Sequence, residues 1–284
     1  MSKKFYPASF DYVFKRIFGD QRNIHILKAF LIAALDLPEE EFDRLEIIDP
    51  HLKREFHDDK MGILDVKVYH KSGVVINVEV QVEISQDLRK RIAFSIGKML
   101  SEQIQRGDEY YRIERVVCIV ICGGVLLSEE PEYYNTYSLR NARSGREFTD
   151  VMEINILEPE KLPSEPDDRR LFNWGQFFKA ETPEELTMIA DKDPAIKEAA
   201  ALVMELNEDD AERMLADARW RWQMDHAALE RKHYREGQEE AETRFKPVID
   251  AINRENEAIS RENEAKNREI AELRRKLREA GIDD

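Results

Sequence analysis

The stretch of sequence that decides the fold runs from Leu64 to Glu83 and reads LDVKVYHKSGVVINVEVQVE. In its second half, every even-numbered position from Val74 to Val82 is valine or isoleucine. The polar residues of the opposite face are Asn77, Glu79, Gln81 and Glu83. The first half repeats this alternation, with Leu64, Val66 and Val68 on one face and Asp65 and Lys67 on the other. Because strand side chains alternate between two faces and only a short loop around Gly73 intervenes, the pattern predicts an antiparallel hairpin.

The register of this hairpin follows from burial. A slip of one residue would turn the valines of one strand away from those of the other, so the apolar faces must coincide. A pairing of Tyr69 with Val75 meets this condition with a short loop, and it sets Asp65 directly opposite Glu79. Lys67 then shares their face with Asn77 and Gln81. Directly opposed Cβ atoms lie about 5 Å apart, so the two carboxylates would repel each other unless a cation neutralised them.

An opposed Asp65 and Glu79 pair is therefore a candidate metal site. Carboxylate oxygens are ligands that Mg²⁺ prefers, and a bound Mg²⁺ polarises a phosphodiester and activates water. The alternative is a solvated hairpin face without chemistry. Two features favour the site, since the strands lie within an α/β core and the next helix carries a basic patch that could hold DNA phosphates. The residues of this patch are Arg89, Lys90, Arg91 and Lys98.

The segments around the hairpin predict an α/β domain with helices around a mixed sheet. The expected elements are helices at 10–19 and 24–35, strands at 44–48, 64–69 and 74–82, a helix at 86–106, and strands at 115–122, 133–138 and 151–157. Ser85 is a candidate N-cap for the helix that follows the hairpin. Beyond three prolines near residue 160 the patterns become helical only, at 168–178, 183–190, 195–206 and 209–245. We therefore predict an α/β domain at 1–160, a helical region at 161–245 and a tail at 246–284.

The tail contains a seven-residue repeat that predicts a coiled coil. The a positions are Ile249, Asn256, Asn263, Ile270 and Leu277, and the d positions are Ile252, Ile259, Lys266 and Leu273. Asparagine at a positions typically fixes the register of a parallel dimer, so we expect a homodimer. The alternative is a solvated single helix whose spacing is fortuitous.

Composition limits the partners of the chain. Lys and Arg number 44 and Asp and Glu 59, which gives a net charge of −15, so any contact with DNA must use a local basic patch. Cys118 and Cys122 lie in one apolar run without further metal-ligand residues nearby, which predicts buried thiols in a reducing compartment. The longest apolar stretch is too short to span a membrane, and the N-terminus has no apolar signal segment. We expect a soluble cytoplasmic protein.

An ordered set of motifs gives the chain a resemblance to a known family. The motifs are Asp11-Tyr12-Val13-Phe14-Lys15 with Phe18-Gly19, Leu64-Asp65-Val66-Lys67, Asn77-Val78-Glu79-Val80-Gln81, Arg91, and Gly107-Asp108-Glu109-Tyr110. Over roughly residues 8 to 160 the chain resembles the Rpn family of recombination-promoting nucleases and transposases, within the PD-(D/E)XK superfamily. The resemblance implies a restriction-endonuclease-like core and a metal-dependent DNA endonuclease that acts in recombination or transposition.

The resemblance also implies roles for individual residues. Asp65 and Glu79 match the two metal-binding carboxylates, with Mg²⁺ as the expected ion and Mn²⁺ as the alternative. Asp11 is similar to the acidic residue that the superfamily often supplies from its first helix. Gln81 stands where the superfamily usually has lysine, and a neutral amide cannot supply a positive charge to the transition state. Lys67 on the same face, or the more distant Arg91, could supply that charge.

A second hypothesis belongs to a different class of protein. The chain could retain the nuclease frame as a catalytically weak or inactive scaffold that acts through its coiled coil. The acidic net charge and the missing motif lysine favour this alternative. The stability of the protein in the presence of metal ions discriminates the two, because an ion that binds only the native state raises the melting temperature.

Overall fold

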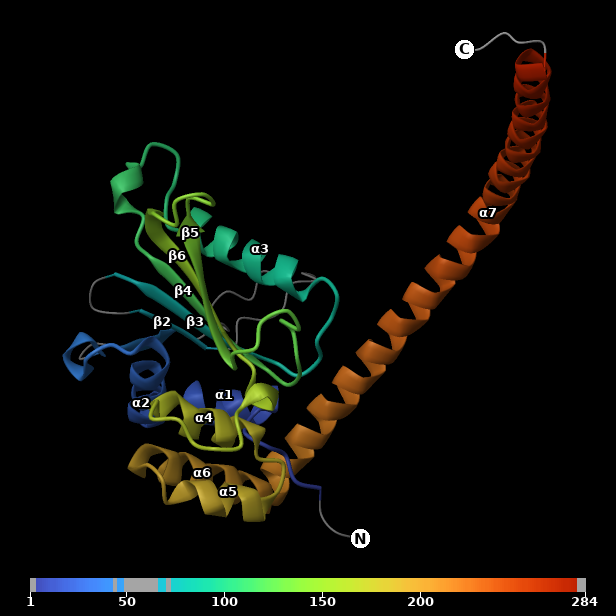
Figure 1. Ribbon diagram of the computed structural model, residues 1–284. Helices are drawn as coiled ribbons and strands as arrows, with labels where there is room; N and C mark the ends of the chain where they lie inside the picture. Colours follow the sequence, from blue (N-terminus) through green and yellow to red (C-terminus); the bar gives the residue numbers. More distant parts are fainter. Residues whose placement is uncertain (1–3, 43–44, 49–65, 70–72, 280–284) are drawn as a thin grey trace. The chain divides into compact units, whose positions relative to one another are not determined.

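A computed structural model describes residues 4–42, 45–48, 66–69 and 73–279 (Figure 1). The chain divides into two compact units, Met1–Arg219 and Trp220–Asp284. Among the described residues, the first unit contains the sheet, the shorter helices and the start of one long helix, and the second unit contains the rest of that helix. Among the described helices, none combines the length with the apolar character that crossing a bilayer requires.

The described residues of the first unit form a mixed six-stranded sheet of order β1-β2-β3-β4-β6-β5. Its strands are β1 (Glu46–Ile48), β2 (Val66–Tyr69), β3 (Val75–Gln81), β4 (Val116–Cys122), β5 (Tyr134–Arg140) and β6 (Glu147–Leu157). The central strands β3, β4 and β6 run parallel, and the flanking pairs are antiparallel. A mixed sheet with flanking helices is the predicted fold class.

The predicted hairpin register is confirmed for the described residues. Tyr69 pairs with Val75, Lys67 pairs with Asn77, and Val66 pairs with Val78. The valines of both strands enter the same apolar cluster, as the burial argument required. Asp65 lies outside the described residues, so its predicted position opposite Glu79 stays a prediction.

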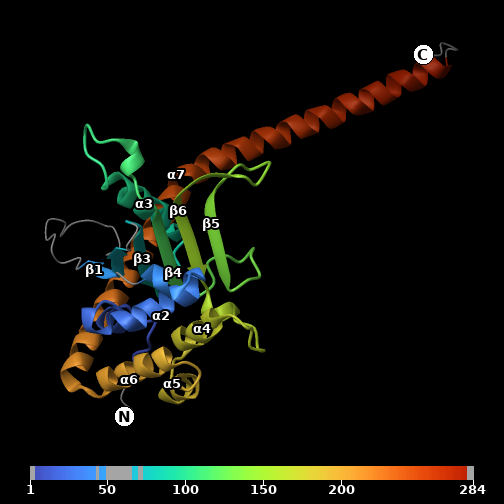
Figure 2. The same cartoon turned by 90° about the vertical axis from the view of Figure 1, so that its left-hand side faces the viewer.

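Helices cover the two faces of the sheet unequally (Figures 1 and 2). The larger cluster joins one face to α1 (Asp11–Phe18), α2 (Ile24–Leu35), α4 (Arg170–Lys179), α5 (Pro183–Ala190) and α6 (Pro194–Glu208). Among the described residues, the other face packs against α3 (Leu88–Ser101) and the segment at Leu126 and Leu127. Strand β3 contributes Ile76, Val78 and Val80 to the larger cluster and Val75 to the smaller one. Its polar residues therefore point toward the side of α3.

The predicted boundary near residue 160 does not separate two cores. Trp174 of α4 lies 5.9 Å from Phe18 of α1 and 5.5 Å from Phe30 of α2, measured between ring centroids. Phe178 of α4 lies 5.3 Å from Phe30. The helices after residue 160 thus complete the core that the first two helices begin, because one face of the sheet offers more apolar surface than two helices cover. The compact unit extends to Arg219.

Several element boundaries differ from the sequence predictions. Helix α3 ends at Ser101, five residues before the predicted end at Arg106. Beyond the helix, the side chain of Gln103 exchanges hydrogen bonds of 2.7 and 3.1 Å with the backbone of Glu114, a tertiary contact that the helical pattern does not reveal. Ser85 is not the N-cap, because Asp87 holds that position and the Ser85 hydroxyl donates to the Asp87 carboxylate at 2.7 Å.

The start of β6 and the extent of helix α7 also differ from the sequence predictions. Strand β6 begins at Glu147, four residues before its predicted start. Helix α7 (Asp210–Glu279) continues through Pro247, whereas the sequence suggested separate segments at 209–245 and 246–284. Proline lacks the N–H that donates to the preceding turn, so one backbone hydrogen bond is missing there, but the helix persists on both sides.

The role of α4 in the core can be tested by comparing two phenylalanines. Phe177 of α4 is fully buried, and Phe94 of α3 is 59% exposed. We expect Phe177→Ala to reduce the free energy of unfolding by about 3 to 5 kcal/mol, because it leaves a cavity in the shared core. Phe94→Ala should change it by less than about 0.5 kcal/mol. Urea denaturation of the full chain measures both, and equal midpoints would mean that α4 does not complete the core.

Candidate active site

Glu79 is a carboxylate buried in the middle of the sheet. It is the fifth residue of β3, it pairs with Val120 of β4, and its exposed fraction is only 4%. The alternation of β3 directs it toward α3, on the same face as Cys118 and Cys122 of the neighbouring strand. Burying a carboxylate costs several kcal/mol unless a charge or a hydrogen bond compensates, so a carboxylate in a central strand is a candidate functional residue.

The pKa values of the two thiols beside Glu79 are raised, in part by its carboxylate. Burial raises the pKa of Cys118 well above its ordinary value, and the carboxylate of Glu79 raises it further. Burial also raises the pKa of Cys122 to about 12, with additional contributions from the carboxylates of Glu158 and Glu79. Both cysteines are free and buried, which confirms that part of the sequence prediction. They stay protonated at neutral pH and act neither as nucleophiles nor as metal ligands.

Asn77 is the second buried polar residue on this face. Its side chain is fully buried, its Nδ2 donates to Cys118 Sγ at 3.8 Å, and its Oδ1 has no hydrogen-bond partner among the described residues. An acceptor without a partner beside a carboxylate suits a hydrated cation, whose bound water could donate to it. Carboxylate and amide oxygens are also the donors that a hard divalent ion takes, so the described residues fit such an ion.

The described part of this site is not a complete set of ligands. Among the described residues, no three His, Cys, Asp or Glu side chains cluster in a way that could hold a metal ion. Asp65, the predicted second ligand, lies outside those residues. The described register places Lys67 opposite Asn77, and therefore on the face of Glu79. This shared face agrees with the sequence prediction, although no observation tests the role of Lys67.

Gln81 lies where the ends of β3 and β4 are fixed to each other. Its carbonyl accepts a 2.8 Å hydrogen bond from the N–H of Gly123, the first residue after β4. Gly123 has to be glycine for this approach, since a Cβ there would lie 2.9 Å from the carbonyl oxygen of Val82. Gln81 is half-buried and follows Glu79 by two residues, so the strand alternation gives both the same face.

Asp11 is held by a residue that the sequence analysis did not single out. Its Oδ2 accepts a hydrogen bond from Arg219 Nε at 2.8 Å and forms an ion pair with Nη2 at 2.7 Å, while its buried Oδ1 has no hydrogen-bond partner in the part of the chain that the structure describes. Helix α1 packs on the face of the sheet opposite to the one that Glu79 faces. The structure therefore places Asp11 in an ion pair with α7, and its supporting role stays a prediction.

Further contacts join the start of α7 to α1. The Tyr12 hydroxyl donates to Glu212 at 2.7 Å, and Arg16 forms an ion pair with the same carboxylate. The hydrogen bond from Arg16 is the main cause that lowers the pKa of Glu212, whereas burial and then Glu212 raise the pKa of Tyr12 to about 12. These partners lie about two hundred residues apart in the sequence, so no local pattern could have indicated them.

The basic patch of α3 divides between two flanks of the helix. Arg89 forms a two-bonded ion pair with Glu129, at 2.6 and 2.9 Å, and also donates to the carbonyl of Leu126. Arg91 and Lys98 are seven residues apart, so they share the other flank, and both are half-buried. Lys90 is exposed. Arg89 is thus committed to an internal partner, and Lys90 and Arg91 form the better candidate for phosphate contacts.

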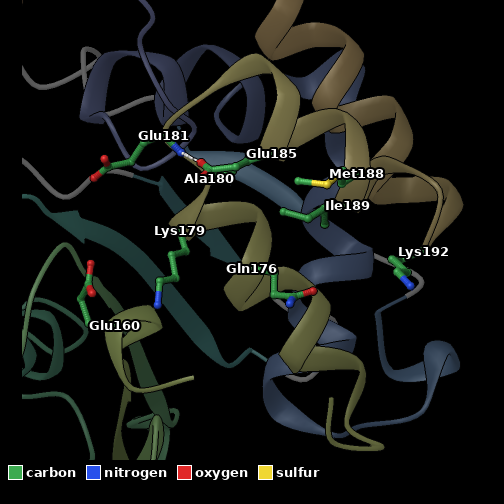
Figure 3. Close-up of a pocket in the computed structure, with 9 residues that line it drawn as sticks. All are labelled: Glu160, Gln176, Lys179, Ala180, Glu181, Glu185, Met188, Ile189 and Lys192. Carbon is green, nitrogen blue, oxygen red and sulfur yellow. Dashed lines mark hydrogen bonds between the residues drawn. The ribbon is translucent and has the colours of Figure 1, made fainter. Parts of the chain in front are cut away.

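A pocket of about 530 Å³ lies elsewhere, over α4 and α5 (Figure 3). It is lined by Glu160, Gln176, Lys179, Ala180, Glu181, Glu185, Met188, Ile189 and Lys192. The Glu185 carboxylate accepts from the N–H groups of Glu181 and Thr182 and so caps the start of α5. No predicted site residue lines this pocket, and its charged groups have both signs. It is distinct from the site around Glu79.

Comparison with known proteins matches the chain to a nuclease family. A family model described as PD-(D/E)XK nuclease family transposase matches residues 8–233. No curated protein and no solved structure matches the chain. The match covers four fifths of the sequence, and it extends beyond the sheet into α7. This extent agrees with the shared core, in which helices after residue 160 pack on the sheet.

The ion pair of Asp11 and Arg219 generates a stability prediction. We expect Arg219→Ala to lower the free energy of unfolding by about 2 kcal/mol, because the buried Asp11 carboxylate loses its compensating charge. Adding Asp11→Ala should recover part of the loss, since no uncompensated carboxylate then remains. Arg22→Ala is the matched control, because Arg22 pairs with Asp20 on the surface and its removal should have no measurable effect. Urea denaturation tests this, and additive losses would rule out coupling.

Proposed function

The chain belongs to the PD-(D/E)XK nuclease family transposases, and we propose that it is a metal-dependent DNA endonuclease that acts in recombination or transposition. Asp65 and Glu79 would hold Mg²⁺, with Mn²⁺ as the alternative ion. When bound, the ion supplies a Lewis acid for the phosphodiester and lowers the pKa of an attacking water. Family membership supports a nuclease that binds DNA, and the finer assignments rest on the residues below.

The observation that carries the proposal is the burial of Glu79 on the polar face of β3. Beside the apolar side chains of β4, its neighbours on that face include an amide and a cation, since Asn77 and Lys67 lie opposite each other two residues away. A hairpin whose face served only solvation would be exposed, but Asn77 and Glu79 are among the most buried polar residues of the described chain. This argues against the solvated alternative for these residues.

The other residues of the proposed site have distinct roles. The amide of Gln81 would orient a water or donate to a phosphate oxygen, as a neutral group can. Lys67 would supply the positive charge that the usual motif lysine gives, with Arg91 as the second candidate. Asp11 would support the site indirectly, through the position of α1. Lys90 and Arg91 would contact DNA phosphates, whereas Arg89 would first have to leave Glu129.

Plasmid nicking tests the proposal directly. With Mg²⁺ or Mn²⁺ the purified protein should convert supercoiled DNA to nicked or linear products, and EDTA should abolish the reaction. Asp65→Ala and Glu79→Ala should each reduce the rate at least a hundredfold, about the effect of removing one group that stabilises transition-state charge. Glu46→Ala, which removes an exposed carboxylate from β1, should retain the wild-type rate.

Other outcomes of this assay have defined meanings. Equal traces of cutting in all variants would indicate a contaminating nuclease. An inert wild type whose melting temperature responds to neither metal would overturn the proposal and leave the scaffold hypothesis. The exposed apolar side chains of α7 are the specific observation that favours an interaction role, either beside catalysis or in place of it.

The tail of α7 supports the proposal of a coiled-coil homodimer. Its described apolar seam residues are about half exposed, namely Ile252, Ile259, Ile270 and Leu273. Ion pairs such as Glu257 with Arg261 and Glu272 with Lys276 join successive turns of the helix outside the a and d positions. A second copy of the chain would bury the seam with its Asn256 and Asn263 in register. Such a dimer would bring two active sites to one duplex, as double-strand cutting requires.

Oligomeric state tests this part of the proposal. Ile259→Asp places a charge in the seam and should shift the molar mass from that of a dimer toward that of a monomer. Ala258→Asp places the same residue at an exposed position outside the seam and should leave the dimer intact. Light scattering coupled to size exclusion measures both at several concentrations. A wild-type chain that is monomeric throughout would contradict the homodimer.

A further inference from the structure

Strands β5 and β6 extend beyond the rest of the sheet as a two-stranded ribbon (Figures 1 and 2). Pairing of β6 with β4 begins at Met152, but β6 itself begins at Glu147. The residues before Met152 therefore pair only with β5, where Thr149 lies opposite Leu139 and Glu147 opposite Arg140. We call residues 139–151 the β5–β6 ribbon.

The tip of the β5–β6 ribbon is closed by hydrogen bonds. The N–H of Asn141 donates to the carbonyl of Arg146 at 2.8 Å, and the N–H of Gly145 donates to the carbonyl of Asn141 at 2.9 Å. The Asn141 side chain accepts from the N–H groups of Arg143 and Ser144, each at 2.9 Å. Gly145 has a φ of +68°, a conformation that favours glycine. The tip is thus held in one conformation before it meets a partner, which reduces the entropy cost of binding.

The tip carries positive charge in a protein whose net charge is −15. Residues 140–146 include three arginines and no acidic residue. Arg140 is paired with Glu147 and donates to Ser138. Arg143 and Arg146 are exposed, and their side chains make no hydrogen bond or ion pair with any described residue. Two guanidinium groups without an internal partner are available for an anionic ligand.

An exposed aromatic ring lies next to these charges. Phe148 is 84% exposed, and it follows Arg146 by two residues, so the ring and the guanidinium group lie close together at the tip end of the ribbon. Strand β4 offers no neighbouring side chain to Phe148, because the ribbon extends past the start of β4. A phenylalanine kept in water beside two such arginines indicates a partner with both anionic and apolar surface.

We propose that the β5–β6 ribbon binds duplex DNA in the major groove, and this inference rests on the proposed function. The major groove is wide enough to admit a two-stranded β-ribbon. Arg143 and Arg146 would contact phosphate oxygens at the groove edges, and Phe148 would contact the apolar edges of bases, such as the thymine methyl group. Duplex DNA presents anionic phosphates and apolar base edges close together, within reach of one ribbon tip.

The strand registers give the distance of this contact from the proposed cleavage site. Glu79 pairs with Val120, and Val120 pairs with Ile156 of β6. Ile156 pairs with Asn135 of β5, and Arg140 of β5, five residues further along, pairs with Glu147, which corresponds to about 17 Å along the ribbon. At about 3.4 Å per base pair this length spans about five base pairs. The ribbon therefore acts as an outer contact, about half a helical turn from the scissile phosphate, and supplies affinity rather than chemistry.

Binding of a DNA duplex by the full-length chain tests the ribbon inference. Every protein in this experiment also carries Glu79→Ala, so that cutting does not interfere with the binding measurement. Fluorescence anisotropy with a labelled duplex of about three helical turns gives the dissociation constant at several salt concentrations. We expect Arg143→Ala with Arg146→Ala to weaken binding at least tenfold and to reduce the slope of log Kd against log salt by nearly two, about 0.9 for each phosphate that is no longer neutralised. Phe148→Ala should weaken binding with an unchanged slope.

The matched control is Arg170→Ala with Arg235→Ala, which removes the same charge from exposed positions on α4 and α7. If this control and the ribbon variant show the same affinity and slope, the ribbon inference is overturned, while DNA binding by the parent and nicking by the wild type would leave the proposed function intact. If the parent binds no duplex and the wild type cuts none, both fall. Because Arg143, Arg146 and Phe148 are exposed, their replacement should leave the melting temperature unchanged.

Discussion

The structure depends on the different chemistry of the two faces of β3. Ile76, Val78 and Val80 bind the sheet to the larger helical layer, and Asn77 and Glu79 point the other way into a thinner layer formed by α3. A parallel central strand is ordinarily apolar on both faces, as β4 is. β3 departs from this rule at Asn77 and Glu79. The packing of its large apolar face offsets the free-energy cost of burying the Glu79 carboxylate. The functional face is thus supported by the packing of the opposite one.

The larger layer explains why helices distant in sequence belong to the nuclease unit. Its aromatic cluster takes Phe14 and Phe18 from the first helix and Trp174, Phe177 and Phe178 from α4. Neither group is covered without the other, so the unit forms only when both ends of the chain's first 219 residues meet. The ion pair of Asp11 with Arg219 lies at the end of the same layer. The position of the first helix is therefore set by the start of α7.

Local patterns predicted what local geometry controls. The period-two alternation and the short loop sufficed for the face and the register of the hairpin, and helix α2 and helix α5 lie where the apolar spacing predicted them. The end of α3 was missed because Gln103 bonds to the backbone of Glu114, and Arg219 was missed because its partner is 208 residues away. The β5–β6 ribbon had a sequence signal, Asn141 and Gly145 between arginines, but its polar strand residues lack the alternation that marks a buried strand.

In an acidic protein that acts on DNA, only a few local basic sites can attract the phosphates. At physiological ionic strength charges are screened beyond about 8 Å, so the net charge of −15 weakens long-range approach but hardly opposes groups already in contact with phosphates. Arginines with internal partners, such as Arg89 with Glu129, add nothing to this attraction, and those without such partners carry it. Because local contacts weaken with salt while the overall repulsion is screened by it, binding should depend on salt less steeply than a count of basic residues implies. Selectivity then depends on where the basic groups lie. The sheet fixes two such places, the face beside Glu79 and the tip of the β5–β6 ribbon.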